Sequence, residues 1–164
     1  MSLLSNSRAR KNIDVSIERK LSMTKFNAAS TSNMVNQQDT DYDWSQYTIL
    51  IAEDEDTNYI YLETALEKTN ATILRAKNGK EAVELARVNP MIDIILMDIK
   101  MPEMNGFEAT RSIKSFRKDI PIIAQTAFAM DEDRRNCSAV GCIDFLAKPI
   151  RYRVLVETLA KYLK

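Results

Sequence analysis

Short apolar runs alternate with amphipathic stretches from residue 47 to residue 163. The apolar runs are rich in isoleucine, leucine and alanine, which is typical of strands buried on both faces of a parallel sheet. The stretches between them repeat apolar residues at helical spacing. The predicted strands cover 47–52, 71–76, 92–97, 121–126 and 142–147, and the predicted helices cover 58–68, 80–88, 107–116, 131–140 and 151–163.

This alternation predicts an α/β fold, in which a doubly wound, five-stranded parallel sheet is flanked by five helices. The run IDIILM at 92–97 is the most apolar and should lie at the centre of the sheet. The helix over 58–68 should be capped by Asp56 or Thr57. The first helix is expected to face the core with Ile60, Leu62, Ala65 and Leu66. The last helix is expected to do so with Val154, Leu155, Leu159 and Leu163.

The first 46 residues differ in composition from the rest of the chain. Residues 1–28 carry six basic and two acidic side chains, whereas 29–46 carry three aspartates and no basic residue. The polar segment 28–38 (AASTSNMVNQQ) is typical of linkers. We therefore predict an N-terminal tail or interdomain linker over 1–46 and one folded domain over 47–164. Within the tail, two alternatives stay open, disorder and a short amphipathic helix with Ile13, Ile17 and Leu21 on one face.

Composition excludes several classes of protein. The full chain contains no histidine, so alone it cannot form a Ser-His-Asp triad, an HExxH zinc site or a phosphohistidine. Three glycines allow neither a GxGxxG fingerprint nor a P-loop. The 23 basic and 23 acidic residues balance, which argues against binding to nucleic acid. No apolar run could span a membrane and no signal-peptide core is present, so we expect a cytoplasmic chain whose Cys137 and Cys142 stay reduced.

Chemically useful side chains stand at the carboxyl ends of the predicted strands. Glu53 and Asp54 follow the first strand and Asp98 the third, while Thr126 ends the fourth strand and Lys148 follows the fifth. Because ligands of an open parallel sheet bind beyond these ends, the five side chains should share one crevice. Carboxylates suit Mg²⁺, and the ammonium and hydroxyl groups can orient a phosphoryl group that a carboxylate accepts. Each residue alone could instead be a helix cap, a turn residue or a solvated charge.

The same residues lie in longer motifs that resemble one protein family. The motifs are ILIAEDEDTN at 49–58, DIILMDIKMPEMNGFEATR at 93–111, PIIAQTA at 121–127 and DFLAKPI at 144–150. Their order and spacing resemble the receiver domain of two-component response regulators, most of all the receivers at the C-terminus of hybrid sensor histidine kinases. The resemblance spans 47–163 and implies a flavodoxin-like receiver fold.

The resemblance also implies a role for each residue at the strand ends. Asp98 would be phosphorylated as an acyl phosphate. Thr126 would hydrogen-bond the phosphoryl group, and Lys148 would form an ion pair with it or with Asp98. The Mg²⁺ cofactor would be held by Glu53, Asp54, Asp98 and the backbone carbonyl of Lys100.

Four further positions follow from the same resemblance. Phe145 would be an aromatic switch residue, with packing in the core as the alternative. Pro149 would follow a cis peptide bond. Glu53 replaces the more usual aspartate, so it could bind the metal through water. Phe128 stands where a small or polar residue is usual, and its ring would shield the acyl phosphate from hydrolysis.

A receiver catalyses its own phosphorylation and dephosphorylation, and its phosphoryl group comes from a histidine kinase or a histidine phosphotransfer protein. Phosphorylation would change the surface formed by 131–140, 142–147 and 151–163, which could also support a dimer. We expect no contact with nucleic acid or with a membrane. Any membrane anchor would belong to a parent kinase.

The whole chain is open to four interpretations. The preferred one is a module of a hybrid histidine kinase, because 1–46 has the polar composition and the segregated charges of a linker. The first alternative is a stand-alone single-domain regulator that acts by protein–protein contact. A receiver-like binding domain without phosphorylation and a nucleotide- or flavin-binding domain are the others.

Overall fold

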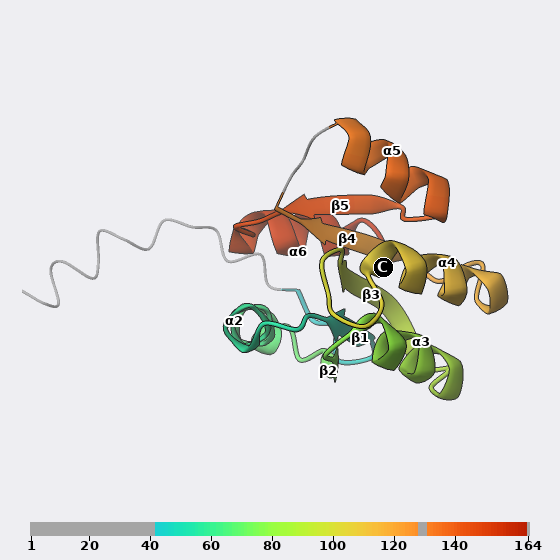
Figure 1. Cartoon of the computed structure of the whole chain (residues 1–164). Coiled ribbons are helices and arrows are strands. Elements are labelled where there is room, and N and C mark those ends of the chain that lie inside the picture. The colour runs from blue at the N-terminus through green and yellow to red at the C-terminus, as the bar shows by residue number, and fades with distance from the viewer. Residues whose placement is uncertain (1–41, 128–130, 164) are drawn as a thin grey trace, which may run out of the picture. The chain divides into compact units, whose positions relative to one another are not determined.

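The computed structural model describes residues 42–127 and 131–163, without the side chains of 131–134. Its strands form one parallel sheet in the order β2-β1-β3-β4-β5, which confirms the predicted doubly wound α/β fold (Figure 1). The strands are β1 (Thr48–Ala52), β2 (Thr72–Ala76), β3 (Ile92–Asp98), β4 (Ile122–Thr126) and β5 (Asp144–Ala147). The helices are α2 (Asp56–Glu67), α3 (Gly79–Val88), α4 (Gly106–Phe116), α5 (Asp131–Val140) and α6 (Tyr152–Ala160).

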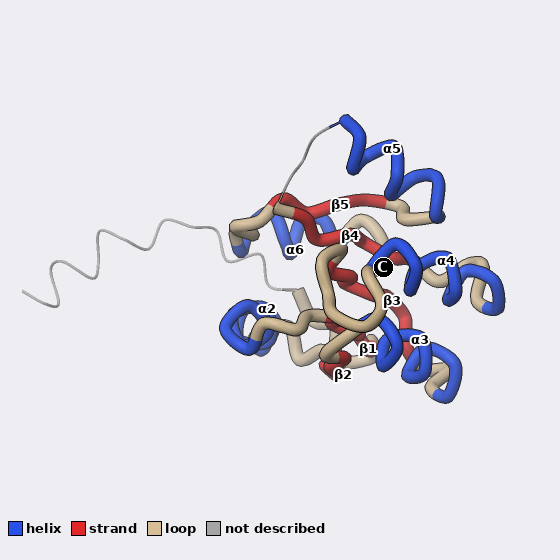
Figure 2. Tube along the Cα trace, in the orientation of Figure 1, coloured by secondary structure: helices blue, strands red, loops and turns tan. Residues whose placement is uncertain are grey.

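Helices cover both faces of the sheet, so the strands form the inner layer (Figure 2). β3 is the central strand, as predicted, and six of its seven residues are buried. α2 and α6 pack on one face, whereas α3 and α4 pack on the other. The two helix layers bury mainly aliphatic side chains against the sheet, namely Leu62, Leu66, Leu155 and Leu159 on the first face and Ala82, Ala86, Ala109 and Ile113 on the second.

Side-chain caps fix the starts of α3 and α4. Asn78 precedes α3, and its side chain accepts a hydrogen bond from the backbone N–H of Glu81 at 2.8 Å. Asn105 and Glu108 form a reciprocal capping box at the start of α4. Such caps satisfy amide groups that the first turn of a helix leaves without partners.

The start of α2 differs from these two. The predicted cap at Asp56 or Thr57 is wrong, because α2 begins at Asp56 and the preceding Glu55 makes no side-chain cap. The carboxylate of Asp56 instead forms an ion pair with Arg75 on β2, at 2.6 Å. The junction between β1 and α2 is therefore held from the neighbouring strand.

Two residues that the sequence places in the core lie at the surface. Ile60 exposes 57% of its area and Val154 exposes 46%. Both helices carry apolar residues on more than one side, so periodicity alone does not choose the buried side. Packing against the sheet buries Leu62 and Leu66 in α2, and Val156 in place of Val154 in α6.

The residues just before β1 pack with the folded domain. Trp44 is 4% exposed and belongs to the core between the sheet and the layer of α2 and α6. Its ring stacks on Tyr42 with 5.0 Å between the centroids, and its backbone N–H donates to the Thr69 carbonyl at 2.6 Å. The predicted division between residues 46 and 47 leaves Trp44 in the tail, although its indole is part of this core. The predicted helix with Ile13, Ile17 and Leu21 lies outside the described residues.

Candidate functional site

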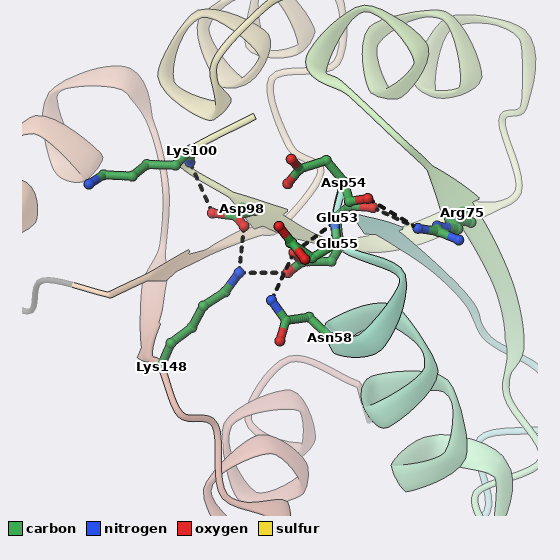
Figure 3. Close-up of polar contacts among 8 residues, drawn as sticks. All are labelled: Glu53, Asp54, Glu55, Asn58, Arg75, Asp98, Lys100 and Lys148. Atoms are coloured by element: carbon green, nitrogen blue, oxygen red, sulfur yellow. Dashed lines mark hydrogen bonds and ion pairs between the residues drawn. The ribbon is translucent and has the colours of Figure 1, made fainter. Parts of the chain in front are cut away.

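Residues from three strand ends meet at one edge of the sheet (Figure 3). Glu53 and Asp54 follow β1, Asp98 is the last residue of β3, and Lys148 follows β5. The Nζ atom of Lys148 lies 2.7 Å from Oε2 of Glu53 and 2.5 Å from Oδ2 of Asp98. One carboxylate oxygen from each acid lies within 4.8 Å of the others. Four of the five side chains predicted to share a crevice therefore lie together, with the Lys148 ammonium group between two of the carboxylates.

Burial and close partners shift the pKa of two groups in this cluster, Glu53 and Lys148. Glu53 is fully buried, and the desolvation raises the pKa of its carboxyl group, although hydrogen bonds from Lys148 and Asn58 oppose the rise. Desolvation by itself would lower the pKa of Lys148. The hydrogen bonds and charges of Asp98 and Glu53 outweigh this effect and raise the pKa of Lys148. Lys148 is therefore a cation at neutral pH.

The loop between β3 and α4 holds Asp98 from the other side. The backbone N–H of Lys100 donates to Oδ1 of Asp98 at 2.9 Å. Gly106, the first residue of α4, donates its N–H to the Ile99 carbonyl at 3.0 Å. A Cβ atom at Gly106 would lie only 2.2 Å from the Asp98 carbonyl oxygen, so glycine permits the close approach of α4. Asp98 thus has little freedom in its backbone or its carboxylate.

The three acids fit a hard divalent cation. They form the group of potential metal ligands found in the described part of the chain, and all of their donor atoms are oxygens. When all are ionised, Glu53, Asp54, Asp98 and Lys148 retain two negative charges, which one Mg²⁺ would balance. Donors already contact both Glu53 oxygens, because Oε1 accepts from Asn58 at 3.2 Å and Oε2 accepts from Lys148. Asp54 is half-buried and is the more accessible ligand.

The other predicted positions surround this cluster. Thr126 is buried at the end of β4, and its carbonyl accepts from the Lys148 backbone N–H at 2.8 Å. The peptide bond between Lys148 and Pro149 is cis, as predicted. Phe128 lies outside the described residues. Phe145 is half-buried and packs on Ile99, Ala124 and Cys137, a contact that agrees with core packing as well as with a switch role.

Comparison with known proteins assigns the chain to a family. The family model described as the response regulator receiver domain matches residues 49–160. The chain belongs to the response regulator receiver family. Among curated relatives of this receiver is the polar-differentiation response regulator DivK of Brucella anthropi, 37% identical over 118 residues, which cover 71% of this chain and 95% of DivK. DivK of Brucella ovis is 36% identical with the same coverage.

Solved structures share the receiver fold. The receiver domain of the sensor histidine kinase PA1611 from Pseudomonas aeruginosa, with magnesium in its active-site cleft, is 34% identical with a TM-score of 0.67. The match covers 71% of this chain and 97% of that receiver. The receiver of Ssk1, solved with the phosphotransfer protein Ypd1 from Saccharomyces cerevisiae, is 29% identical with a TM-score of 0.68, over 72% of this chain and 89% of that one. As a receiver, this chain is a component of two-component signal transduction.

In the part of the receiver that the structure describes, no helix is both long enough and apolar enough to cross a lipid bilayer.

Sequence reasoning missed three residues of the receiver site. Asn58 donates to Glu53, and Arg75 contacts the segment that follows β1. Gln125 pairs with Asp98 in the sheet register and is fully buried, yet its amide atoms have no hydrogen-bond partner within the described residues. Arg75 had a visible sign, because it is the one charge in the apolar run ATILRA. Asn58 and Gln125 had none, because only the folded packing brings them to the acids.

Proposed function

We propose that Asp98 accepts a phosphoryl group from a phosphohistidine on a partner protein, in a reaction that depends on Mg²⁺. The observation that carries this proposal is the setting of the Asp98 carboxylate. It is 5% exposed at the end of the central strand, with the Lys148 ammonium beside it and two further acids within reach of a shared cation. A carboxylate in such a setting can act as a nucleophile toward phosphorus.

The transfer would be an in-line displacement. One Asp98 oxygen forms the new O–P bond while the N–P bond of the donor breaks, and the electron pair of that bond returns to the imidazole of the donor. Lys148 balances negative charge on a phosphoryl oxygen. The Thr126 hydroxyl would donate to another phosphoryl oxygen. Water later hydrolyses the acyl phosphate, which restores the Asp98 carboxylate and releases inorganic phosphate.

Asp54, Asp98 and the Lys100 backbone carbonyl are proposed to hold Mg²⁺ directly, with Glu53 acting through water. The donors already in contact with both Glu53 oxygens support this division of roles. When bound, Mg²⁺ neutralises charge on the phosphoryl oxygens. The magnesium ion in the PA1611 receiver supports the choice of metal.

The phosphorylated state would be read on α5, β5 and α6, the surface that could also support a dimer. Thr126 and Phe145 are the proposed switch residues. Their positions support this proposal, because Thr126 ends β4 and the Phe145 ring lies against Cys137 of α5. Slow hydrolysis of the acyl phosphate because of Phe128 stays a prediction.

The proposed phosphoryl donor is a histidine kinase or a histidine phosphotransfer protein. The complex of the Ssk1 receiver with Ypd1 supports a donor of the second kind. We further propose that the chain is a module of a hybrid histidine kinase with residues 1–46 as a linker, which the likeness to the PA1611 receiver supports. A stand-alone regulator is the second candidate, because the match covers 95% of DivK.

Phosphotransfer to the full chain tests the assignment of Asp98. The native chain and Asp98→Asn would be incubated with Mg²⁺ and radiolabelled acetyl phosphate or a phosphorylated histidine phosphotransfer protein. We expect hydroxylamine-sensitive label on the native chain and none on Asp98→Asn. Asp93→Asn is the matched control, because Asp93 is exposed near the other end of the same strand. Label that persists on Asp98→Asn would falsify the assignment.

A further inference from the structure

Arg75 on β2 contacts the segment that carries two of the three acids (Figure 3). Its Nη2 atom lies 3.4 Å from the Glu53 carbonyl oxygen, 3.5 Å from the Asp54 carbonyl oxygen and 2.6 Å from the Asp56 carboxylate. The guanidinium also lies over the Tyr59 ring, 4.3 Å from its centroid. The Arg75 side chain is 18% exposed, whereas the Asp56 carboxylate that it contacts is 71% exposed. One arginine therefore contacts both residues that follow β1 and two residues of the first turns of α2.

These contacts replace a helix cap. α3 and α4 begin with asparagine caps, whereas the residue before α2, Glu55, makes no side-chain cap. The first turn of α2 is instead fixed by the ion pair of Asp56 with Arg75, which is anchored in a strand paired to β1 through Ile51. A strand is a more rigid anchor than a loop.

The contacts reach the acid-bearing segment through its backbone. Arg75 binds the carbonyl oxygens of Glu53 and Asp54, and its charge is balanced by Asp56. The carboxylates of Glu53 and Asp54 stay available toward Asp98. Three neighbouring carboxylates repel one another, and the ion pairs of Lys148 reach Glu53 and Asp98, so contacts that fix the backbone of the uncapped segment help to keep all three acids converged.

We propose that Arg75 is a positioning residue for the divalent-cation site: it fixes the segment 53–56 so that its acids converge with Asp98. The proposal rests on the proposed Mg²⁺-dependent function. Outer-shell groups that orient metal ligands typically change metal affinity by about 10- to 100-fold. We expect removal of Arg75 to weaken Mg²⁺ binding by about tenfold.

The sign of the effect separates positioning from simple charge. Arg75→Met removes a cation and leaves Asp56 without its partner, so the site becomes more negative. Coulomb attraction alone would then make Mg²⁺ bind more tightly. Positioning predicts weaker binding. The double variant Arg75→Met with Asp56→Asn restores the charge balance but not the contacts with segment 53–56. It should therefore bind Mg²⁺ as weakly as Arg75→Met.

Isothermal titration of the full chain with MgCl₂ at constant ionic strength tests the proposal. We expect about a tenfold higher Kd for Arg75→Met and the double variant, and a smaller rise for Arg75→Lys, which keeps the charge but loses the planar fork. Arg87→Met is the matched control, because Arg87 also covers an aromatic ring, that of Phe116 at 4.5 Å, on another helix. Arg87→Met should bind as the native chain does.

Three results would overturn the proposal. The first is a Mg²⁺ affinity of Arg75→Met equal to or tighter than that of the native chain, and the second is recovery of native Mg²⁺ affinity in the double variant. The third is native Mg²⁺ affinity in Arg75→Lys, which remains a test if Arg75→Met does not fold. Failure of the proposed function would look different, because the native chain itself would then bind no Mg²⁺ or take no label at Asp98. At saturating Mg²⁺, Arg75→Met should still be labelled at Asp98.

Discussion

At the scale of single residues, Glu53 is an ionisable carboxyl group that is fully buried. Its pKa is raised mainly by desolvation, with the hydrogen bond from Lys148 as the main opposing effect. A carboxyl group whose pKa is higher in the folded state adds stability at low pH. That stability is lost as the pH rises through the folded-state pKa. Above the folded-state pKa, and without a divalent cation, the ionised form of Glu53 therefore lowers the stability of the domain.

Glu53→Gln should show this effect through its pH dependence. We expect the free energy of unfolding of Glu53→Gln, minus that of the native chain, to increase as the pH rises from about 4 to 8. Urea unfolding followed by circular dichroism, in the presence of a chelator, measures the difference. Glu84→Gln on the exposed side of α3 is the control and should give a flat difference. A difference for Glu53→Gln that stays flat or falls would contradict the cause given for the pKa shift.

The sequence predicted the position of the acidic residues better than it predicted the contacts that hold them in place. Glu53, Asp54, Asp98 and Lys148 could be placed together because the carboxyl ends of parallel strands share one edge. The sequence marked Arg75 as the one charge in the run ATILRA, but it could not show the contacts of Arg75 with 53–56, because these depend on how the start of α2 lies against β2. The same packing left α2 without the cap that its sequence suggested.

At the scale of elements, α4 and β3 are joined by one close contact at the site. Gly106 allows the start of α4 to touch the backbone of Asp98, and the Asn105 capping box fixes the direction in which the helix leaves. The sequence marked this turn by the motif MPEMNG, but it could not show which strand residue the glycine touches. In α2 and α6, likewise, periodicity gave the helices but misplaced Ile60 and Val154.

Gly106→Ala tests this contact. In an ordinary helix position, the change from glycine to alanine stabilises a protein by about 1 kcal/mol. Here the new Cβ would lie 2.2 Å from the Asp98 carbonyl oxygen, so we expect destabilisation by about 1–3 kcal/mol and slower labelling of Asp98. Urea unfolding and the phosphotransfer assay measure the two effects. A gain in stability with native labelling would show that the contact is not tight.

At the scale of the whole molecule, cation binding and folding should be linked. The proposed ligands come from β1 and β3, which pair at the centre of the sheet, so the site is complete only in the folded chain. A ligand that binds only the native state stabilises it by about 2.7 kcal/mol at a concentration 100-fold above its Kd.

We therefore expect Mg²⁺ to raise the free energy of unfolding of the native chain by about this amount. Asp54→Asn should lose most of the gain, whereas Asp93→Asn should keep it. Denaturation curves with MgCl₂, compared with KCl at matched ionic strength, provide the measurement. Equal stabilisation of all three chains would point to general screening instead of a specific site.

The burial of Trp44 has a practical consequence for such work. It is the only tryptophan of the chain, and it is packed beside the amino end of β1, whereas Glu53 follows the carboxyl end of that strand. Five residues at about 3.3 Å each separate the two by roughly 16 Å. The indole emission spectrum should therefore shift when the chain unfolds and stay unchanged when ions or phosphoryl mimics enter the crevice. One optical signal would then report folding in samples whose occupancy is followed by another method.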